Sequence, residues 1–76
     1  MHDLLVRFKL IKNNYVFEVI LDCRLSFIDN FKLLQNIIKL DLKDAKVYDP
    51  NKRLFLDRNI PICEFNIQYF MYLYIF

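Results

Sequence analysis

The order of apolar patterns along these 76 residues predicts one α+β domain, spanning residues 1–76, with a helix packed across one face of a sheet. Residues 4–12 place apolar side chains at every second position, which is the period of a strand, whereas residues 27–38 repeat them every three or four positions, which is the period of a helix. Residues 69–76 are rich in aromatic side chains and contain no breaker, which favours a further strand. A chain with 57% apolar residues can bury enough carbon to fold.

Two strands joined by a tight turn are expected over residues 4–12 and 15–22. Asn13 and Asn14 lie between them, and in a chain without glycine asparagine is the residue best able to adopt the positive φ of a two-residue hairpin turn. The positions expected to face inward are all apolar: Leu4, Val6, Phe8, Leu10, Phe17, Val19 and Leu21.

A helix is expected to begin after Ser26 and to end near residues 40–43. The Ser26 hydroxyl can cap the free backbone N–H groups of the first turn, and Asp29 places a carboxylate near the positive end of the helix dipole. The apolar stripe that should face the sheet contains Phe27, Phe31, Leu34 and Ile38, and Leu33 and Ile37 are expected to widen it.

The second half of the chain predicts a short hairpin and a final strand. Residues 45–48 and 53–56 flank a turn signal at residues 49–52, which contains Pro50. A short helical turn is expected at residues 61–65, before the aromatic strand that closes the chain.

Two short segments resemble ubiquitin. The letters KRLFLD at residues 52–57 and CEFNIQ at residues 63–68 are similar to ubiquitin's GKQLED and SDYNIQ. The order strand, strand, helix, strand, short strand, turn, strand is also that of the ubiquitin-like β-grasp fold. The resemblance implies a mixed sheet of ββαββ order plus a short turn, in which the first and last strands run side by side in the same direction.

One feature of conjugated ubiquitin-like proteins is missing, because the chain contains no glycine and ends in Tyr74, Ile75 and Phe76 instead of Gly-Gly. Conjugation and sulfur transfer are therefore not expected. The chain looks most like the short bacterial YukD/EsaB-type ubiquitin-like proteins, which accompany type VII secretion systems and also stop at the last strand. This resemblance implies an accessory protein that binds other proteins.

The charge pattern restricts the compartment and the partners. The formal net charge of +2 is too weak to indicate nucleic acid as the main partner. Charged residues interrupt the first dozen positions, which argues against a signal peptide, and the apolar C-terminal run is too short for a membrane-spanning helix. A cytoplasmic protein without membrane insertion is expected.

The residues needed for catalysis are scarce. The chain has one histidine, His2, near the N-terminus, and one serine, Ser26, which already serves as the expected helix cap. A phosphate-cradling loop requires glycine, and the carboxylates form no evident acid–base pair. The sequence therefore predicts a protein that is not an enzyme, with no catalytic residue, metal or cofactor.

Two cysteines, Cys23 and Cys63, lie far apart in the sequence without zinc-ligand spacing. The simpler interpretation is two thiols that fill space as small apolar side chains. The ubiquitin resemblance implies that they could be neighbours, which leaves a redox-active pair open.

The final strand carries the best candidate binding site. If Met71, Leu73 and Ile75 face the core, the alternate side chains line the outer sheet face beside the outward residues of the first strand. Aromatic side chains with a nearby arginine are common anchors of protein interfaces. Either a protein partner or a second copy of the chain could cover this face, or the rings could simply shield the sheet. The candidate partner-binding residues are Arg7, Lys9, Ile11, Tyr72, Tyr74 and Phe76.

An alternative site is basic. Lys46, Lys52, Arg53 and Arg58 surround the expected second hairpin and could contact RNA. Such charges more commonly form a solvated edge, which discourages the addition of a foreign strand.

Overall fold

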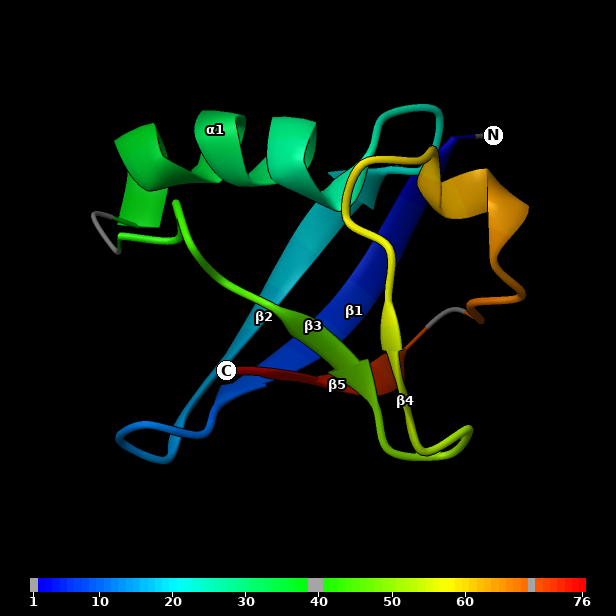
Figure 1. Ribbon diagram of the computed structural model, residues 1–76. Helices are drawn as coiled ribbons and strands as arrows, with labels where there is room; N and C mark the ends of the chain where they lie inside the picture. Colours follow the sequence, from blue (N-terminus) through cyan, green and yellow to red (C-terminus); the bar gives the residue numbers. More distant parts are fainter. Residues whose placement is uncertain (1, 39–40, 69) are drawn as a thin grey trace.

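In the computed structural model, which describes residues 2–38, 41–68 and 70–76, the chain forms five strands, one α-helix and one short 3-10 helix (Figure 1). In chain order these are β1 (Asp3–Leu10), β2 (Tyr15–Asp22), α1 (Phe27–Ile38), β3 (Val47–Asp49), β4 (Leu54–Leu56), η1 (Ile62–Glu64) and β5 (Met71–Ile75). The predicted α+β order is confirmed, including the short helical turn before the last strand.

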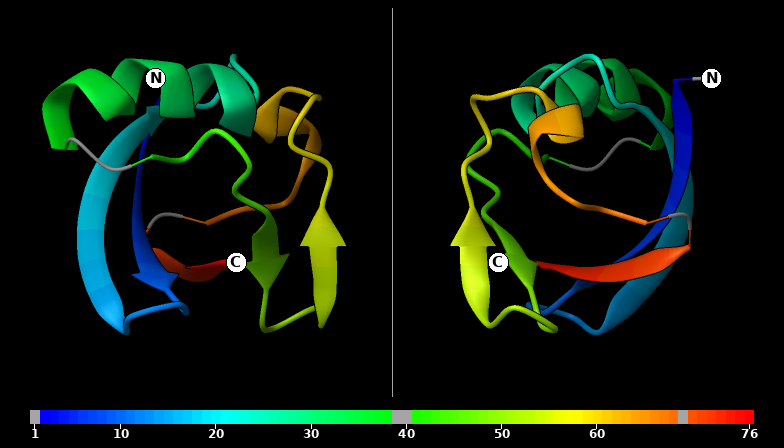
Figure 2. Two further views of the ribbon diagram at one scale, coloured as in Figure 1. Left: turned by 60° about the vertical axis from the view of Figure 1, so that its left-hand side comes forward. Right: turned by 90° about the vertical axis from the view of Figure 1, so that its right-hand side faces the viewer.

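The five strands form one mixed sheet in the order β2-β1-β5-β3-β4. β1 pairs antiparallel with β2 and parallel with β5, while β3 pairs antiparallel with both β5 and β4. The expected parallel arrangement of the first and last strands is therefore confirmed. The sheet is curved, and α1 lies over its concave side (Figure 2).

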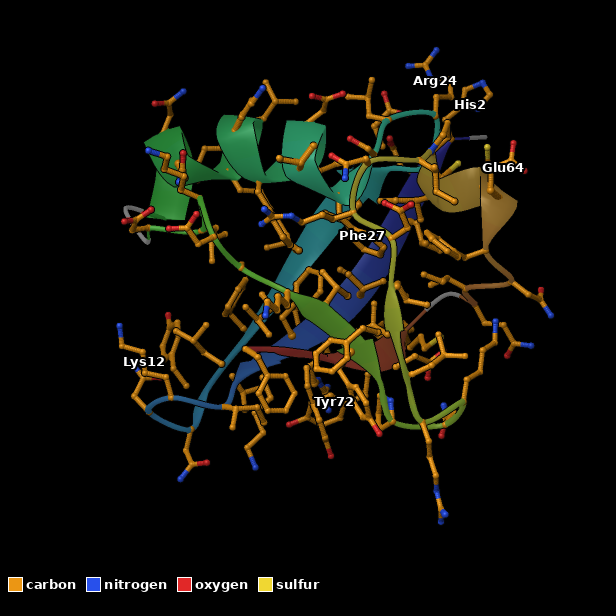
Figure 3. The ribbon with its side chains drawn as sticks, viewed as in Figure 1. His2, Lys12, Arg24, Phe27, Glu64 and Tyr72 are labelled. Carbon is orange, nitrogen blue, oxygen red and sulfur yellow. The ribbon has the colours of Figure 1, made fainter. Side chains whose placement is uncertain are left out.

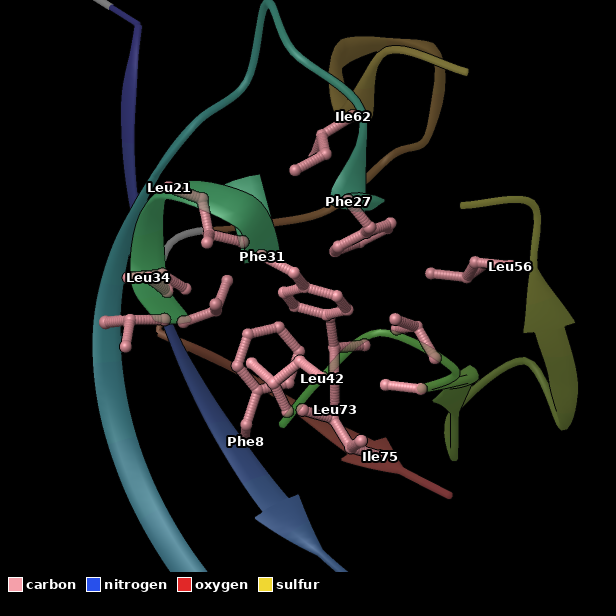
Figure 4. Close-up of a cluster of buried hydrophobic side chains, with 14 residues drawn as sticks. Phe8, Leu21, Phe27, Phe31, Leu34, Leu42, Leu56, Ile62, Leu73 and Ile75 are labelled. Carbon is pink, nitrogen blue, oxygen red and sulfur yellow. The ribbon is translucent and has the colours of Figure 1, made fainter. Parts of the chain in front are cut away.

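The core fills the space between α1 and the concave side of the sheet. Phe27 points from the start of α1 toward the sheet (Figure 3), and the Phe8 ring from β1 contacts it and Phe31 at centroid distances of 6.4 and 5.8 Å (Figure 4). Full burial of each such side chain stabilises the fold by roughly 1.5–3 kcal/mol. The buried apolar residues are Val6, Phe8, Val19, Leu21, Phe27, Phe31, Leu34, Leu42, Ala45, Val47, Leu56, Ile62, Leu73 and Ile75.

The apolar stripe of α1 is narrower than the sequence predicts. Leu33 and Ile37 are 58% and 74% exposed, so the expectation that they widen the stripe is wrong. Both residues lie on the flank of the helix, because successive side chains turn by about 100° and the curved sheet covers one stripe only. Phe27, Phe31 and Leu34 are buried as expected, and the Ile38 side chain lies outside the described residues.

The first hairpin turns differently from the prediction. Leu10 pairs with Tyr15, so residues 11–14 form the loop and the expected two-residue turn is wrong. Asn14 adopts positive φ (58°), as its position suggests, whereas the backbone N–H of Ile11 donates to the carbonyl of Ile75 at 3.0 Å. The N–H of Asn13 donates to the carbonyl of Leu10 at 3.3 Å, so the chain turns after Leu10 and Ile11 lies in the loop.

The second hairpin is closed by a buried carboxylate. Asp49 is fully buried, and its Oδ1 accepts hydrogen bonds from the backbone N–H groups of Asn51 (2.9 Å) and Lys52 (3.3 Å). Arg53 then adopts positive φ (56°), and its N–H donates to the carbonyl of Asp49 at 2.8 Å. These bonds satisfy the backbone of a turn that contains no glycine.

The final strand is shorter than expected. It begins at Met71 because Phe70 adopts positive φ (67°), a conformation that interrupts an extended chain. Tyr69, the first residue of the predicted strand, lies outside the described residues.

A polar side chain that the sequence did not single out ties α1 to β2. Asn30 is 3% exposed, and its Nδ2 donates to the carbonyls of Asp22 (3.0 Å) and Ser26 (2.8 Å). Its Oδ1 accepts from the N–H of Asp22 at 2.9 Å. Ser26 caps the helix as predicted, because its Oγ accepts from the N–H of Asp29 at 3.1 Å.

Replacing Asn30 by Ala should lower the free energy of unfolding by about 2–3 kcal/mol, because it leaves the backbone N–H of Asp22 without its acceptor and removes the Nδ2 hydrogen bonds to the carbonyls of Asp22 and Ser26. The exposed Asn36 on the same helix is the matched control, and Asn36→Ala should change stability by less than about 0.5 kcal/mol. Urea unfolding followed by circular dichroism measures both. An equal decrease in the free energy of unfolding for the two variants would contradict the role of Asn30.

The connection between β2 and α1 holds one short ion pair. The Arg24 guanidinium donates to both carboxylate oxygens of Asp22 at 3.0 and 2.9 Å, and the N–H of Arg24 donates to Oδ1. The hydrogen bonds from the Arg24 side chain, followed by that from its backbone, lower the pKa of Asp22 from 3.8 to about 2.

Because the folded pKa lies below the unfolded pKa, this pair stabilises the fold above about pH 4 and loses its effect as the pH falls toward 2. A carboxyl NMR titration should give a pKa of about 2 for Asp22. Arg24→Ala should raise that pKa toward 3.8, whereas the control Lys52→Ala should not move it. A pKa near 3.8 in the unmodified protein would show that the pair does not form in solution.

Candidate functional site

The convex face of the sheet, opposite α1, carries a cluster of aromatic rings, which we call the outer aromatic face. Alternation along β5 produces it: Leu73 and Ile75 are buried and Met71 packs against the core, as predicted, so the residues between them point outward. In Figure 3, Tyr72 lies on the side of the sheet away from α1. The face consists of Tyr48, Phe55, Tyr72, Tyr74 and Phe76.

Tyr48 is the centre of this face. Its ring contacts those of Phe55, Phe76 and Tyr74 at centroid distances of 5.0, 5.8 and 6.3 Å. Phe55 also contacts Phe76 at 5.6 Å, and Tyr72 contacts Tyr74 at 5.6 Å. These distances are typical of aromatic pairs, so the five rings form one continuous surface.

Two members of the face were missed at the level of sequence. Tyr48 lies between the buried Val47 and Asp49 in β3, and Phe55 immediately precedes the buried Leu56 in β4. Alternation within these short strands was the available signal, because a residue next to a buried position points to the opposite face. Tyr48 pairs with Tyr74 in β5 and with Phe55 in β4, which brings the three rings together.

Cationic side chains border the rings. Arg7 and Lys9 of β1 lie directly opposite Tyr72 and Tyr74 in the parallel register, as expected for this face. Arg7 pairs with Glu18 of β2 at 2.9 Å, and both side chains remain about half exposed (45% and 46%). Within the described part of the chain, Lys9 has no carboxylate within ion-pair distance.

The remaining predicted residues lie at one end of the face. Phe76 exchanges two backbone hydrogen bonds with Lys46, at 3.0 and 2.9 Å, which places the exposed Lys46 beside the rings. Ile11 lies in the first loop, half-buried, where its N–H binds the carbonyl of Ile75. The structure thus brings five of the six candidate residues onto one face and puts Ile11 at its border.

A polar hollow adjoins Tyr72. It has a volume of about 460 Å³ and is lined by residues of the β3–β4 loop, of the segment before β5 and of the start of β5. Lys52 contributes an ammonium group, while Asn51, Asn66 and Gln68 contribute amides. The apolar face therefore has a hydrogen-bonding border on this side.

The basic group around the second hairpin does not form one patch. Lys46 and Arg58 flank one end of the hairpin, whereas Lys52 and Arg53 lie in the loop at the other end. Arg58 Nη1 donates to the carbonyls of Lys43 (3.1 Å) and Ala45 (2.7 Å), so this side chain holds the preceding connection in place.

The two cysteines are neighbours. The backbone N–H of Cys63, in η1, donates to the carbonyl of Cys23 at 2.9 Å. Cys23 is half-buried against the core and Cys63 is exposed, and both thiols are free. The proximity that the ubiquitin resemblance implied is therefore confirmed.

The described residues contain no helix with the length and hydropathy of a transmembrane span. They also contain no group of three or more His, Cys, Asp or Glu side chains placed to hold a metal ion.

Solved structures match the whole architecture. The ubiquitin-like domain of the Arabidopsis thaliana protein At2g32350 superposes with a TM-score of 0.74 at 19% identity, over 100% of this chain and 78% of that one. The UBL domain of yeast Ddi1 superposes with a TM-score of 0.69 at 14% identity, over 99% of this chain and 88% of that one. This chain has a ubiquitin-like fold. No protein-family model and no curated protein matches it.

These identities establish the ubiquitin-like fold alone. The two neighbours come from a plant and a yeast, so the resemblance to bacterial YukD/EsaB-type proteins stays a prediction.

The outer aromatic face should tolerate substitution better than the core that supports it. Tyr74→Ser removes a half-buried ring and should lower the free energy of unfolding by about 1 kcal/mol, whereas Leu73→Ala should lower it by about 3 kcal/mol because it opens a cavity in the core. Urea unfolding compares the two variants. Equal losses would show that Tyr74 belongs to the core instead of to an available surface.

Proposed function

We propose that this ubiquitin-like domain is a non-catalytic protein-interaction module that binds its partner through the outer aromatic face. The partner surface is apolar at its centre and carries carboxylates at its edge. The continuous contact of five rings on a sheet face that α1 leaves uncovered is the observation that carries this proposal.

The rings are suited to binding because they already support one another. Phe55 and Phe76 are 54% and 52% exposed, yet their rings contact each other and Tyr48. A side chain that is ordered before binding loses less conformational entropy on binding, so more of the apolar contact is available as affinity. An exposed apolar surface of this kind also marks interaction sites on small proteins.

The charges around the rings indicate the charge of the partner surface. Lys9, Lys46 and Lys52 border the rings or the adjoining hollow, and Glu18 is the carboxylate that pairs with Arg7 on the same face. A cationic border attracts an acidic partner and increases the rate of encounter. An apolar centre with a polar border is also the usual anatomy of a protein interface.

A second copy of the chain is a less suitable occupant of this face. Stacking two outer aromatic faces would bring Lys9 and Lys46 of one copy near the same cationic border of the other. Like charges opposed across an interface are unfavourable. We therefore assign the face to a different protein, and self-association is an outcome that the experiment below detects.

We further propose a cytoplasmic bacterial accessory of a type VII-like secretion system. Support comes from the resemblance in the apolar last strand and from the absence of glycine. A gene for a secretion ATPase beside the gene for this chain would strengthen the proposal.

The alternative of an RNA-contacting domain has less support. The basic residues divide between the two ends of the second hairpin, and Arg58 is occupied by backbone carbonyls. Binding to a phosphate backbone requires several cations on one continuous surface.

The double variant Tyr72→Ser/Tyr74→Ser should bind the partner much more weakly than the unmodified chain does. Immobilised chain recovers the partner from cell extract, and calorimetry with the purified partner then measures Kd. Since an anchoring aromatic contributes about 2 kcal/mol or more, Kd should rise at least about thirtyfold. Lys9→Glu should also weaken binding. Its effect on Kd should be larger at low salt than at high salt, because salt screens electrostatic attraction.

The matched control is Leu33→Ser/Ile37→Ser, which also removes two exposed apolar side chains but from α1. It should keep the affinity of the unmodified chain. If the control variant loses binding and the tyrosine variant keeps it, the partner binds α1 and not the outer aromatic face. A dimer in sedimentation equilibrium that the tyrosine variant abolishes would assign the face to self-association.

A further inference from the structure

Cys23 and Cys63 belong to two segments that pair beside the start of α1. Ser26 and Pro61 form an antiparallel bridge, and the N–H of Ile62 donates to the carbonyl of Leu25 at 3.0 Å. The hydrogen bond from Cys63 to Cys23 continues this pairing. Backbone pairing between residues 23–26 and 61–63 therefore holds the two cysteines next to each other.

The hydrogen bond limits the distance between the two residues. With standard backbone bond lengths, an N···O distance of 2.9 Å places the two Cα atoms at most about 6.8 Å apart. Disulfides in proteins join residues whose Cα atoms are about 4.4–6.8 Å apart. The backbone thus already brings Cys23 and Cys63 within the range of a disulfide.

Their exposure differs in a way that suits exchange chemistry. Cys63 is exposed, so it contributes little to the core and is open to reagents, whereas Cys23 is half-buried against the core. An accessible thiol beside a second cysteine is the usual arrangement of a reversible thiol pair. Simple space-filling accounts for Cys23 but not for Cys63.

We infer that Cys23 and Cys63 form a site for reversible thiol–disulfide exchange with small-molecule disulfides such as oxidised glutathione. The Cys63 thiolate attacks the small disulfide, forms a mixed disulfide and releases one small thiolate. The Cys23 thiolate then attacks Sγ of Cys63 and expels the second small thiolate. The protein loses two hydrogens and the small disulfide is reduced to two thiols, so the electrons balance.

The resulting bond would join the β2–α1 connection to η1. It would close a loop of about 40 residues, which restricts the unfolded chain more strongly than a short loop does. Figure 3 shows His2, Arg24 and Glu64 at this end of the molecule and Tyr72 at the other. The exchange site is therefore independent of the proposed docking face, and either can fail without the other.

The test uses the reduced full-length chain in buffers with increasing ratios of oxidised to reduced glutathione. Intact mass should reveal a monomer that lacks two hydrogens and carries no glutathione. The melting temperature of this species should be higher by roughly 10 °C and should return to its starting value after reduction. Cys23→Ser should stop at one glutathione adduct on Cys63, whereas Cys63→Ser, which lacks the accessible thiol, should react more slowly, and neither variant should show such a rise.

Three outcomes would overturn the inference. They are a monomer that carries two glutathiones, a disulfide-linked dimer without the internally linked monomer, and no reaction at any ratio. A linked monomer that melts at a lower temperature would also overturn it, because the bond would then form only by distorting the native backbone.

Discussion

The parallel pairing of β1 with β5 joins the two ends of the chain at the centre of the sheet, and both faces of the molecule depend on its register. On the concave side, the register places Phe8 opposite Leu73, both fully buried. On the convex side, it places Arg7 opposite Tyr72. A slip by one residue would turn the core side chains toward solvent, so burial of the core also determines the composition of the outer aromatic face.

The helix completes this arrangement from the concave side and does not contribute to the outer aromatic face. Ser26 caps α1 and Asn30 binds the backbone of Asp22, so the first turn is attached to the end of β2 by hydrogen bonds and not by apolar packing alone. This attachment organises the corner that contains Cys23. The two proposed sites therefore lie apart: the outer aromatic face is on the convex side of the sheet, and the cysteine pair is at the corner where α1 begins.

Local patterns predicted the faces of the long strands, the start of α1 and most of the candidate site. These patterns gave wrong or incomplete predictions where a strand is short, and where the exposure of a side chain depends on how far a neighbouring element extends. β3 has only three residues, so its alternation is a weak signal in the sequence, and Tyr48 was overlooked although it is the centre of the aromatic cluster. Leu33 and Ile37 repeat with a helical period, but the curved sheet does not extend far enough to cover them.

The sequence by itself determined the strands, the helix and the side of each element that is apolar, because these follow from backbone periods of two and 3.6 residues that operate between near neighbours. Only the tertiary structure decided which distant segments meet. Tyr48 joins Tyr74, Arg58 binds the carbonyl of Ala45, and Cys63 lies beside Cys23, because burying the whole core selects one strand order. No local pattern contains that information, since it depends on contacts between residues far apart in the chain.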